Sequence, residues 1–308
     1  AMNTRYAQNE PALIMERAAE DLGTGIRWMH EELGFERVVL LGFSGGGSLA
    51  SFYQSQAENP TVTATPAGDP ADLASAKLLP ADGLILLGAH PGRARVLRNW
   101  IDGAVTDEID PYRSDPALDL YAPGRRAPLD ADWVEGYRAA QLERMARIDT
   151  WAFDELDRLD AAGGSDRAFV VHRTVADPRF IDLGIDPSDR APGSMYGDPA
   201  AANTAAGGLA RFVTVRSWLS TWSFEHTQAD ATKDLFHVSA PTTVICLMGD
   251  QAAFPSDSRM MHDALPDPGT ELVELPNLSH YLVGQSDGLA EVIARIHNWV
   301  SAQKWRKQ

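Results

Sequence analysis

The chain has 308 residues, of which 44% are hydrophobic and 23% charged, a balance that predicts a globular fold with one large core or a core plus an insert. Its net charge of −16 argues against nucleic acid as a partner, because phosphate contacts need clustered lysine and arginine, and an anionic membrane surface would repel it. No apolar run is long enough for a membrane span and no signal peptide is visible, so we expect a cytoplasmic protein.

The beginning of the chain alternates helical and strand patterns. Apolar residues recur every three or four positions over residues 11–33, which predicts an amphipathic helix. Residues 37–42 are a short apolar run, rich in β-branched side chains and typical of a strand buried on both faces, and residues 84–89 predict a second such strand. Between them, residues 48–57 are predicted to be helical and residues 59–80 to form a surface loop.

The middle of the chain, residues 91–238, breaks this rhythm. Its clearest element is a helix predicted near residues 132–159, and it holds five of the eight tryptophans. The alternation then resumes, with strands predicted at residues 243–248 and 271–275 and helices at 257–264 and 287–303. Strands that alternate with helices predict a parallel sheet covered by helices on both faces. The one cysteine, Cys246, lies in an apolar run and excludes an intramolecular disulfide.

The pentapeptide Gly42-Phe43-Ser44-Gly45-Gly46 joins the first predicted strand to the helix that follows. In this context G-x-S-x-G predicts a nucleophile elbow, a tight turn that holds Ser44 in a strained conformation with its hydroxyl exposed at the sheet edge. We expect glycine two residues to either side, because larger side chains would collide with neighbouring backbone. The helix N-terminus and the N–H of Gly45 would stabilise an oxyanion. The alternative of a phosphate-binding loop is disfavoured, because the sequence has no G-x-G-x-x-G or G-K-[ST] pattern.

A serine nucleophile needs a base, and the base needs a carboxylate to orient it. His280 follows the last predicted strand, in the run P-N-L-S-H before the final helix, where a base would be expected. For the acid, Asp250 lies at the end of the preceding predicted strand, and Asp257, past Pro255, is the runner-up. We therefore expect a triad of Ser44, His280 and an acid, with Asp250 favoured over Asp257.

In these features the sequence resembles the α/β-hydrolase superfamily over residues 1–92 and 239–308. Two positions depart from the family pattern: N-T-R-Y at residues 3–6 stands in place of the usual D-x-R-G, and Asp250 precedes Pro255 by five residues where about four is common. The resemblance implies an α/β-hydrolase core made from those two ranges and a largely helical cap at residues 93–238. It also implies three or four strands ahead of the elbow helix, for which the chain has no room. We expect a preceding segment or a second copy of the chain to complete the sheet, and a preceding segment to supply the second oxyanion-hole donor.

The predicted function is that of a serine hydrolase that cleaves an ester or related acyl bond of a small, largely apolar substrate. His90, directly after a predicted strand, is a candidate for the substrate pocket, together with Phe43 and Tyr281. No cofactor is expected, and no metal site, because the sequence has no paired ligands of the H-E-x-x-H kind. Two alternatives stay open: acyl transfer or carbon–carbon bond hydrolysis by the same triad, and a non-catalytic binding protein that keeps the fold.

Overall fold

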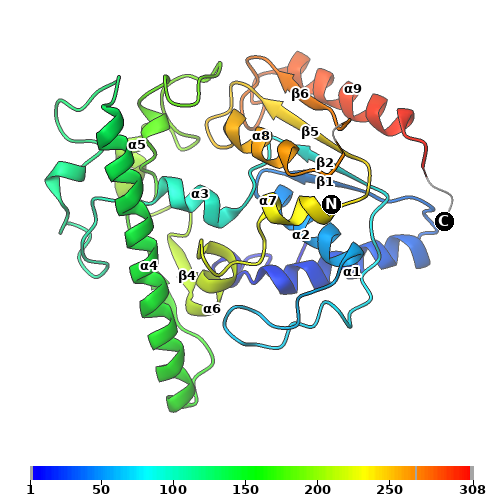
Figure 1. Cartoon of the computed structure of the whole chain (residues 1–308), viewed down its shortest axis with the longest axis horizontal. Helices are drawn as coiled ribbons and strands as arrows, with labels where there is room; N and C mark the ends of the chain where they lie inside the picture. The colour runs from blue at the N-terminus through cyan, green and yellow to red at the C-terminus, as the bar shows by residue number, and fades with distance from the viewer. Residues whose placement is uncertain (1–2, 268, 306–308) are drawn as a thin grey trace.

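A four-stranded parallel sheet forms the centre of the protein. The computed structural model describes residues 3–267 and 269–305, and the strands of its main sheet lie in the order β1-β2-β5-β6 (Figure 1). Their bounds are β1 (Val39–Phe43), β2 (Gly83–Leu87), β5 (Thr242–Leu247) and β6 (Leu272–Leu275). All three pairings between neighbours are parallel, which confirms the predicted α/β class and the mostly parallel sheet.

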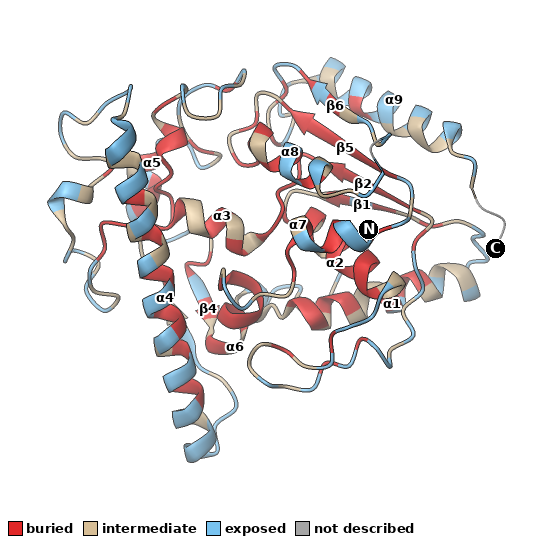
Figure 2. Ribbon diagram, in the orientation of Figure 1, coloured by how far each residue is buried: buried red, intermediate tan, exposed pale blue. Residues whose placement is uncertain are grey.

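Helices cover both faces of this sheet: α1 (Met15–Glu31), α2 (Gly45–Glu58), α8 (Pro255–Asp263) and α9 (Ser286–Ala302). Because successive side chains of a strand point to opposite faces, Leu84 and Leu86 of β2 pack toward α1 and α2. Ile85 and Leu87, from the same strand, pack toward α9 on the other face. The two central strands, β2 and β5, are therefore buried along their whole length (Figure 2).

The helix predicted over residues 11–33 begins later than expected. Residues Glu10–Ala12 form a short 3₁₀ turn, η1, and Ile14 is extended before α1 starts at Met15. The reason is a tertiary contact: the Met15 N–H donates to the Ser220 hydroxyl, and the carbonyl of Leu13 accepts from Thr221. Partners from far along the chain thus satisfy backbone groups that would otherwise favour a continuous helix.

The segment between β2 and β5 contains one long helix, several short helices and two short strands. Its elements are α3 (Arg93–Trp100), η2 (Pro116–Leu118), α4 (Ala131–Ala162), β3 (Ala168–Val170), η3 (Pro178–Phe180), α5 (Pro199–Thr204), β4 (Phe212–Thr214), α6 (Val215–Ser217), η4 (Trp218–Trp222), α7 (Ala231–Asp234) and η5 (Leu235–His237). Strands β3 and β4 form a small antiparallel pair that the sequence patterns did not predict, since three residues are too few to show an alternation. We call this segment, residues 93–238, the insert.

The long helix α4 gives the insert its own core. Asp130 caps its start by accepting from the N–H of Trp133, and Gly163, in the left-handed conformation, ends it. Figure 2 shows buried and exposed positions alternating along α4, as one face packs inward. On that face, Met145 and Ile148 pack in one apolar cluster with Trp218.

The end of the insert packs with the sheet domain. Ala229, Ala231, Leu235 and Val238 belong to the same apolar cluster as α1 and α2. In α1, the buried carboxylate of Glu16 accepts from the Ser220 hydroxyl and the Gln228 amide. The insert and the sheet domain therefore share buried polar and apolar contacts.

Candidate active site

Ser44 lies in a sharp turn between β1 and α2. Its φ of 52° is in the left-handed region, which is uncommon for a residue other than glycine, and its side chain is only partly buried. Gly42 makes this turn possible, because a methyl group built on it would lie 2.7 Å from the Cα of Gly47. The turn therefore has the strained, tightly packed geometry of a nucleophile elbow, at the carboxyl edge of the sheet.

The expectation that Gly46 is also needed for lack of space is wrong. A methyl group built on Gly46 would meet no atom within 4 Å among the described residues, so a side chain fits there. The crowded position is the next one, Gly47, where the added methyl group would lie 2.5 Å from the Cβ of Ala89. The first turn of α2 thus approaches β2 through Gly47, which lies outside the G-x-S-x-G motif.

A chain of hydrogen bonds links Ser44, His280 and Asp250. His280 Nε2 lies 3.1 Å from Ser44 Oγ, and His280 Nδ1 lies 2.7 Å from Asp250 Oδ2. The other carboxylate oxygen, Oδ1, accepts from the N–H groups of Ala252 and Ala253, so the carboxylate is held from both sides. Asp250 and His280 are buried, whereas Ser44 is partly exposed to solvent. This arrangement suits an orienting acid, a base and a nucleophile that a substrate can reach.

Asp257, the runner-up for the acid, lies elsewhere. Its Oδ2 accepts from the N–H of Phe254 at the start of α8, and no hydrogen bond joins it to His280 in residues 3–267 and 269–305. Burial raises the pKa of its carboxyl group to about 6, although the charge of Arg179 opposes this shift. Asp257 acts on the structure of α8, whereas Asp250 contacts the candidate base.

Three further residues that the sequence indicated for the pocket surround the triad. Phe43 stacks on the His280 imidazole with ring centroids 4.9 Å apart, and Tyr281, well exposed, packs edge-on against the same imidazole. His90 is buried, and its N–H lies 3.5 Å from the carbonyl oxygen of Ser44. Burial lowers the pKa of His90 to about 3, helped by the nearby charges of Arg93 and His280, so its imidazole is neutral near pH 7.

Gly45 is the first residue of α2, so its N–H has no partner within the helix and is free to face an oxyanion. The residue beside it is one that the sequence reasoning missed. A methyl group built on Gly45 would lie 2.9 Å from the guanidinium carbon of Arg93, the first residue of α3. The available signal was its place directly after the run His90-Pro91-Gly92 that follows β2, at the edge of the sheet where ligands bind.

The insert contacts the loops that carry His280 and Asp250. The N–H of Asp189 donates to the carbonyl of Met248 at 2.9 Å, and its carboxylate accepts from the N–H of Asn277 at 2.8 Å. Figure 1 shows the insert beyond the ends of the strands at which these loops begin. Hydrogen bonds thus join two loops of the sheet domain to one loop of the insert.

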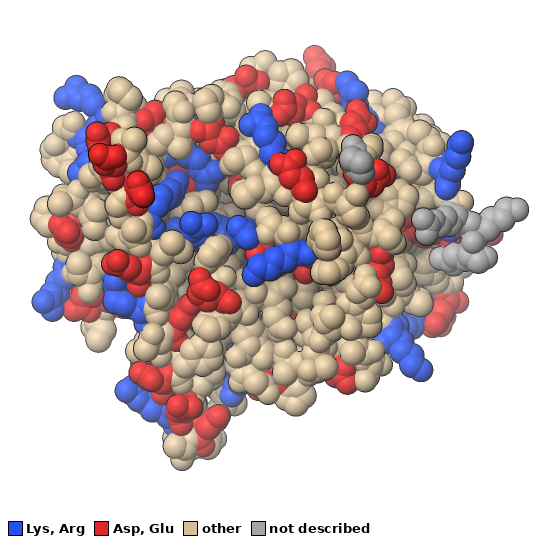
Figure 3. All heavy atoms as spheres, viewed as in Figure 1, with Lys and Arg blue, Asp and Glu red and all other residues tan. Residues whose placement is uncertain are grey.

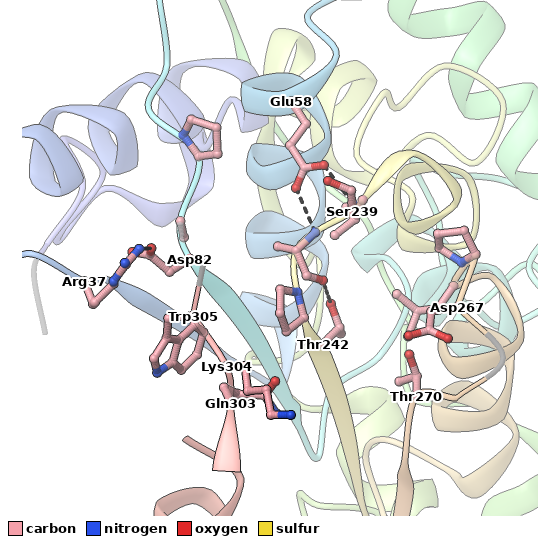
Figure 4. A pocket seen from close by; sticks show the side chains of 17 residues that line it. Arg37, Glu58, Asp82, Ser239, Thr242, Asp267, Thr270, Gln303, Lys304 and Trp305 are labelled. Atoms are coloured by element: carbon pink, nitrogen blue, oxygen red, sulfur yellow. Dashed lines mark hydrogen bonds and ion pairs between the residues drawn. The ribbon is translucent and has the colours of Figure 1, made fainter. Parts of the chain in front are cut away.

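One large cavity lies far from this site. Figure 4 shows it lined by Arg37, Asp82 and Thr242, among others, residues that precede or begin their strands. The triad residues follow their strands, and since the strands are parallel the two sets lie at opposite edges of the sheet. This cavity therefore has no part in the chemistry of Ser44.

No helix among the described residues is both long and apolar enough to cross a membrane.

No family model matches the chain, and no curated protein matches it. Among solved structures, the chain is similar to an alpha/beta fold family hydrolase from Bacillus anthracis, with 15% identity over 96% of this chain and 76% of the other and a TM-score of 0.38. It is also similar to a monoacylglycerol lipase from Paleococcus ferrophilus, with 16% identity, coverage of 94% and 77%, and a TM-score of 0.40. The third example is the alpha/beta hydrolase GrgF from a Penicillium species, with 13% identity, coverage of 94% and 72%, and a TM-score of 0.44. At this distance the similarities say nothing about activity.

Proposed function

We propose that the protein is a serine hydrolase that cleaves an ester or related acyl bond. The hydrogen-bonded chain from Ser44 Oγ through His280 to Asp250 supports this proposal more than any other observation. The strained turn at Ser44 and the free N–H of Gly45 at the start of α2 support it further.

In the proposed reaction, Ser44 Oγ attacks the carbonyl carbon of the substrate while His280 Nε2 takes the hydroxyl proton. Asp250 holds the imidazole in the required orientation and stabilises its protonated form. The Gly45 N–H donates to the oxyanion of the tetrahedral intermediate. His280 then gives the proton to the leaving alkoxide, and water activated by His280 hydrolyses the acyl-enzyme to release the acid and restore the serine hydroxyl.

We further propose that the insert acts as a cap over this site, with His90, Phe43 and Tyr281 at the substrate pocket. The hydrogen bonds from Asp189 to the two catalytic loops support this role. A cap in this position would exclude water and shape the pocket for a small substrate.

Labelling with a fluorophosphonate probe tests the proposal, because the probe reacts covalently with an activated serine. We expect mass spectrometry to place the label on Ser44. We also expect Ser44→Ala to abolish labelling and to lower kcat for p-nitrophenyl valerate by at least about 10³-fold. Ser75→Ala, in the loop between α2 and β2, is the control and should label as the wild type does. A folded wild-type protein that is not labelled would contradict the proposal and favour a binding protein.

A further inference from the structure

The three arginines of α3 have different surroundings. Arg95 pairs with Asp230, Nε to Oδ1 at 2.7 Å, and Arg98 lies over the ring of Phe224 at 4.8 Å. Arg93 lies over the Trp222 ring at 5.9 Å and, like Arg98, has no hydrogen bond or ion pair in the part of the chain that the structure describes; its Nε is buried without a partner. Arg93 as a whole is only partly buried, and an anionic group that arrives with a ligand would give its guanidinium the charged partner that it lacks.

The electrostatic surroundings of Arg93 favour an anion. Its guanidinium lies against Gly45, the first residue of α2, so it meets the positive end of that helix dipole. His90 next to it is neutral near pH 7, so its imidazole leaves the positive charge of Arg93 uncompensated. Although the whole chain carries −16, Figure 3 shows lysine and arginine side chains gathered over and beside α3.

A cavity of about 510 Å³ extends from Arg93 along α1 and α2. Its walls are mixed: the apolar side chains of Leu13, Met15, Ala18 and Leu49 lie among residues of the segment before α1, namely Asn3, Thr4, Tyr6, Ala7, Gln8 and Glu10. The Glu10 side chain is exposed and forms no ion pair with Arg93 among the described residues. The cavity therefore combines mixed polar and apolar walls with one guanidinium, which suits a ligand that carries an anionic group.

We propose that Arg93 is a specificity-determining residue that binds a carboxylate on the acyl chain of the substrate. This inference rests on the proposed serine hydrolase function. The guanidinium lies where a side chain of Gly45 would project, beside the N–H that faces the oxyanion. A group at that point meets atoms of the acyl chain beyond the carbonyl, so the preferred substrate is the monoester of a short dicarboxylic acid.

Two esters of nearly equal shape test this preference: mono-p-nitrophenyl glutarate, whose acyl chain ends in a carboxylate, and p-nitrophenyl valerate, whose chain ends in a methyl group. We expect the wild type to have the higher kcat/KM for the glutarate ester. Arg93→Met keeps most of the side-chain length and removes the charge. It should lower the ratio of the two kcat/KM values by about 30-fold or more, because the carboxylate loses its charged partner. Arg98→Met, on the same helix, is the matched control and should leave the ratio within about threefold of the wild type.

Equal losses on both esters in Arg93→Met would overturn the inference, since they would indicate a role in stabilising the oxyanion. So would a wild type that prefers valerate. If the protein is not labelled by the fluorophosphonate and cleaves neither ester, the proposed function fails, yet the carboxylate site is still tested by calorimetry. Glutarate should bind Ser44→Ala, and adding Arg93→Met should weaken its binding by about 30-fold or more. Unchanged or undetectable binding would reject the site, with thermal unfolding used to verify that each variant is folded.

Discussion

At the scale of single residues, Asp250 and Asp257 lie seven positions apart and have different surroundings. Asp250 reaches His280 because it lies in the turn just after β5 and its carboxylate is fixed by the N–H groups of Ala252 and Ala253. Asp257 lies inside α8 and turns its carboxylate back to the helix start. Side-chain direction separates the two, and direction depends on the local backbone, which spacing alone does not reveal.

Asp250→Asn should lower kcat for p-nitrophenyl valerate by about 10³- to 10⁴-fold, because an amide at this position no longer stabilises the protonated imidazole or fixes its tautomer. Asp257→Asn should keep kcat within about tenfold of the wild type. Steady-state kinetics on both variants, with circular dichroism to verify folding, makes the comparison. The reverse order of effects would assign the acid to Asp257.

The buried carboxyl group of Asp257 also predicts a dependence of stability on pH. Because burial raises its pKa from 3.8 to about 6, the folded state keeps a proton between these values that the unfolded state has lost. Below pH 4, Asp257 therefore contributes its full share to the free energy of unfolding. This contribution, up to about 3 kcal/mol, is lost as the pH rises through about 6. Asp257→Asn cannot ionise. In urea titrations from pH 4 to pH 7, its free energy of unfolding should rise relative to the wild type; a constant difference would show that the pKa is not raised.

At the scale of elements, the order of strands and helices in the sheet domain was predictable because its apolar runs are long and separated by clear turns. The fold class, the four strands and the turn at Ser44 follow from those patterns. Three features did not. The break before α1 depends on a hydrogen bond to Ser220, about 200 residues away. Strands β3 and β4 are too short to show a period. The packing of Arg93 against Gly45 depends on how α3 and α2 meet. The first and third are tertiary effects and the second is a matter of length, and none of them leaves a local pattern in the sequence.

The turn that leads into α2 offers a test on neighbouring glycines. Gly46→Ala should stabilise the protein by up to about 1 kcal/mol, because space is free and alanine favours the helix. Gly47→Ala should destabilise it by about 1–3 kcal/mol, because the new methyl group meets Ala89. Thermal and urea unfolding measure both changes. Equal effects would mean that the first turn of α2 shifts to accept either side chain.

At the scale of the whole molecule, buried contacts join the insert to the sheet domain, so we expect the two to unfold in one transition. Glu16 of α1 lies at the centre of these contacts. Glu16→Ala should lower the free energy of unfolding by about 1–3 kcal/mol, because Ser220 and Gln228 lose a buried acceptor. Calorimetry measures this loss and the number of transitions.

Glu20→Ala is the matched control on the same helix. Glu20 forms ion pairs at the surface with Arg5 and Arg17, so its loss should change stability by at most about 1 kcal/mol. Two separate transitions in the wild type, or equal effects of the two substitutions, would mean that the insert and the sheet domain are not coupled through Glu16.

The strained backbone at Ser44 has a consequence for engineering. A residue other than glycine at a φ of 52° costs of order 1–3 kcal/mol, and glycine would relieve most of that cost. A directed-evolution campaign that selects only for heat resistance would therefore favour glycine at position 44 and discard the proposed nucleophile. Improving this protein for use at high temperature requires a screen for ester cleavage in every round.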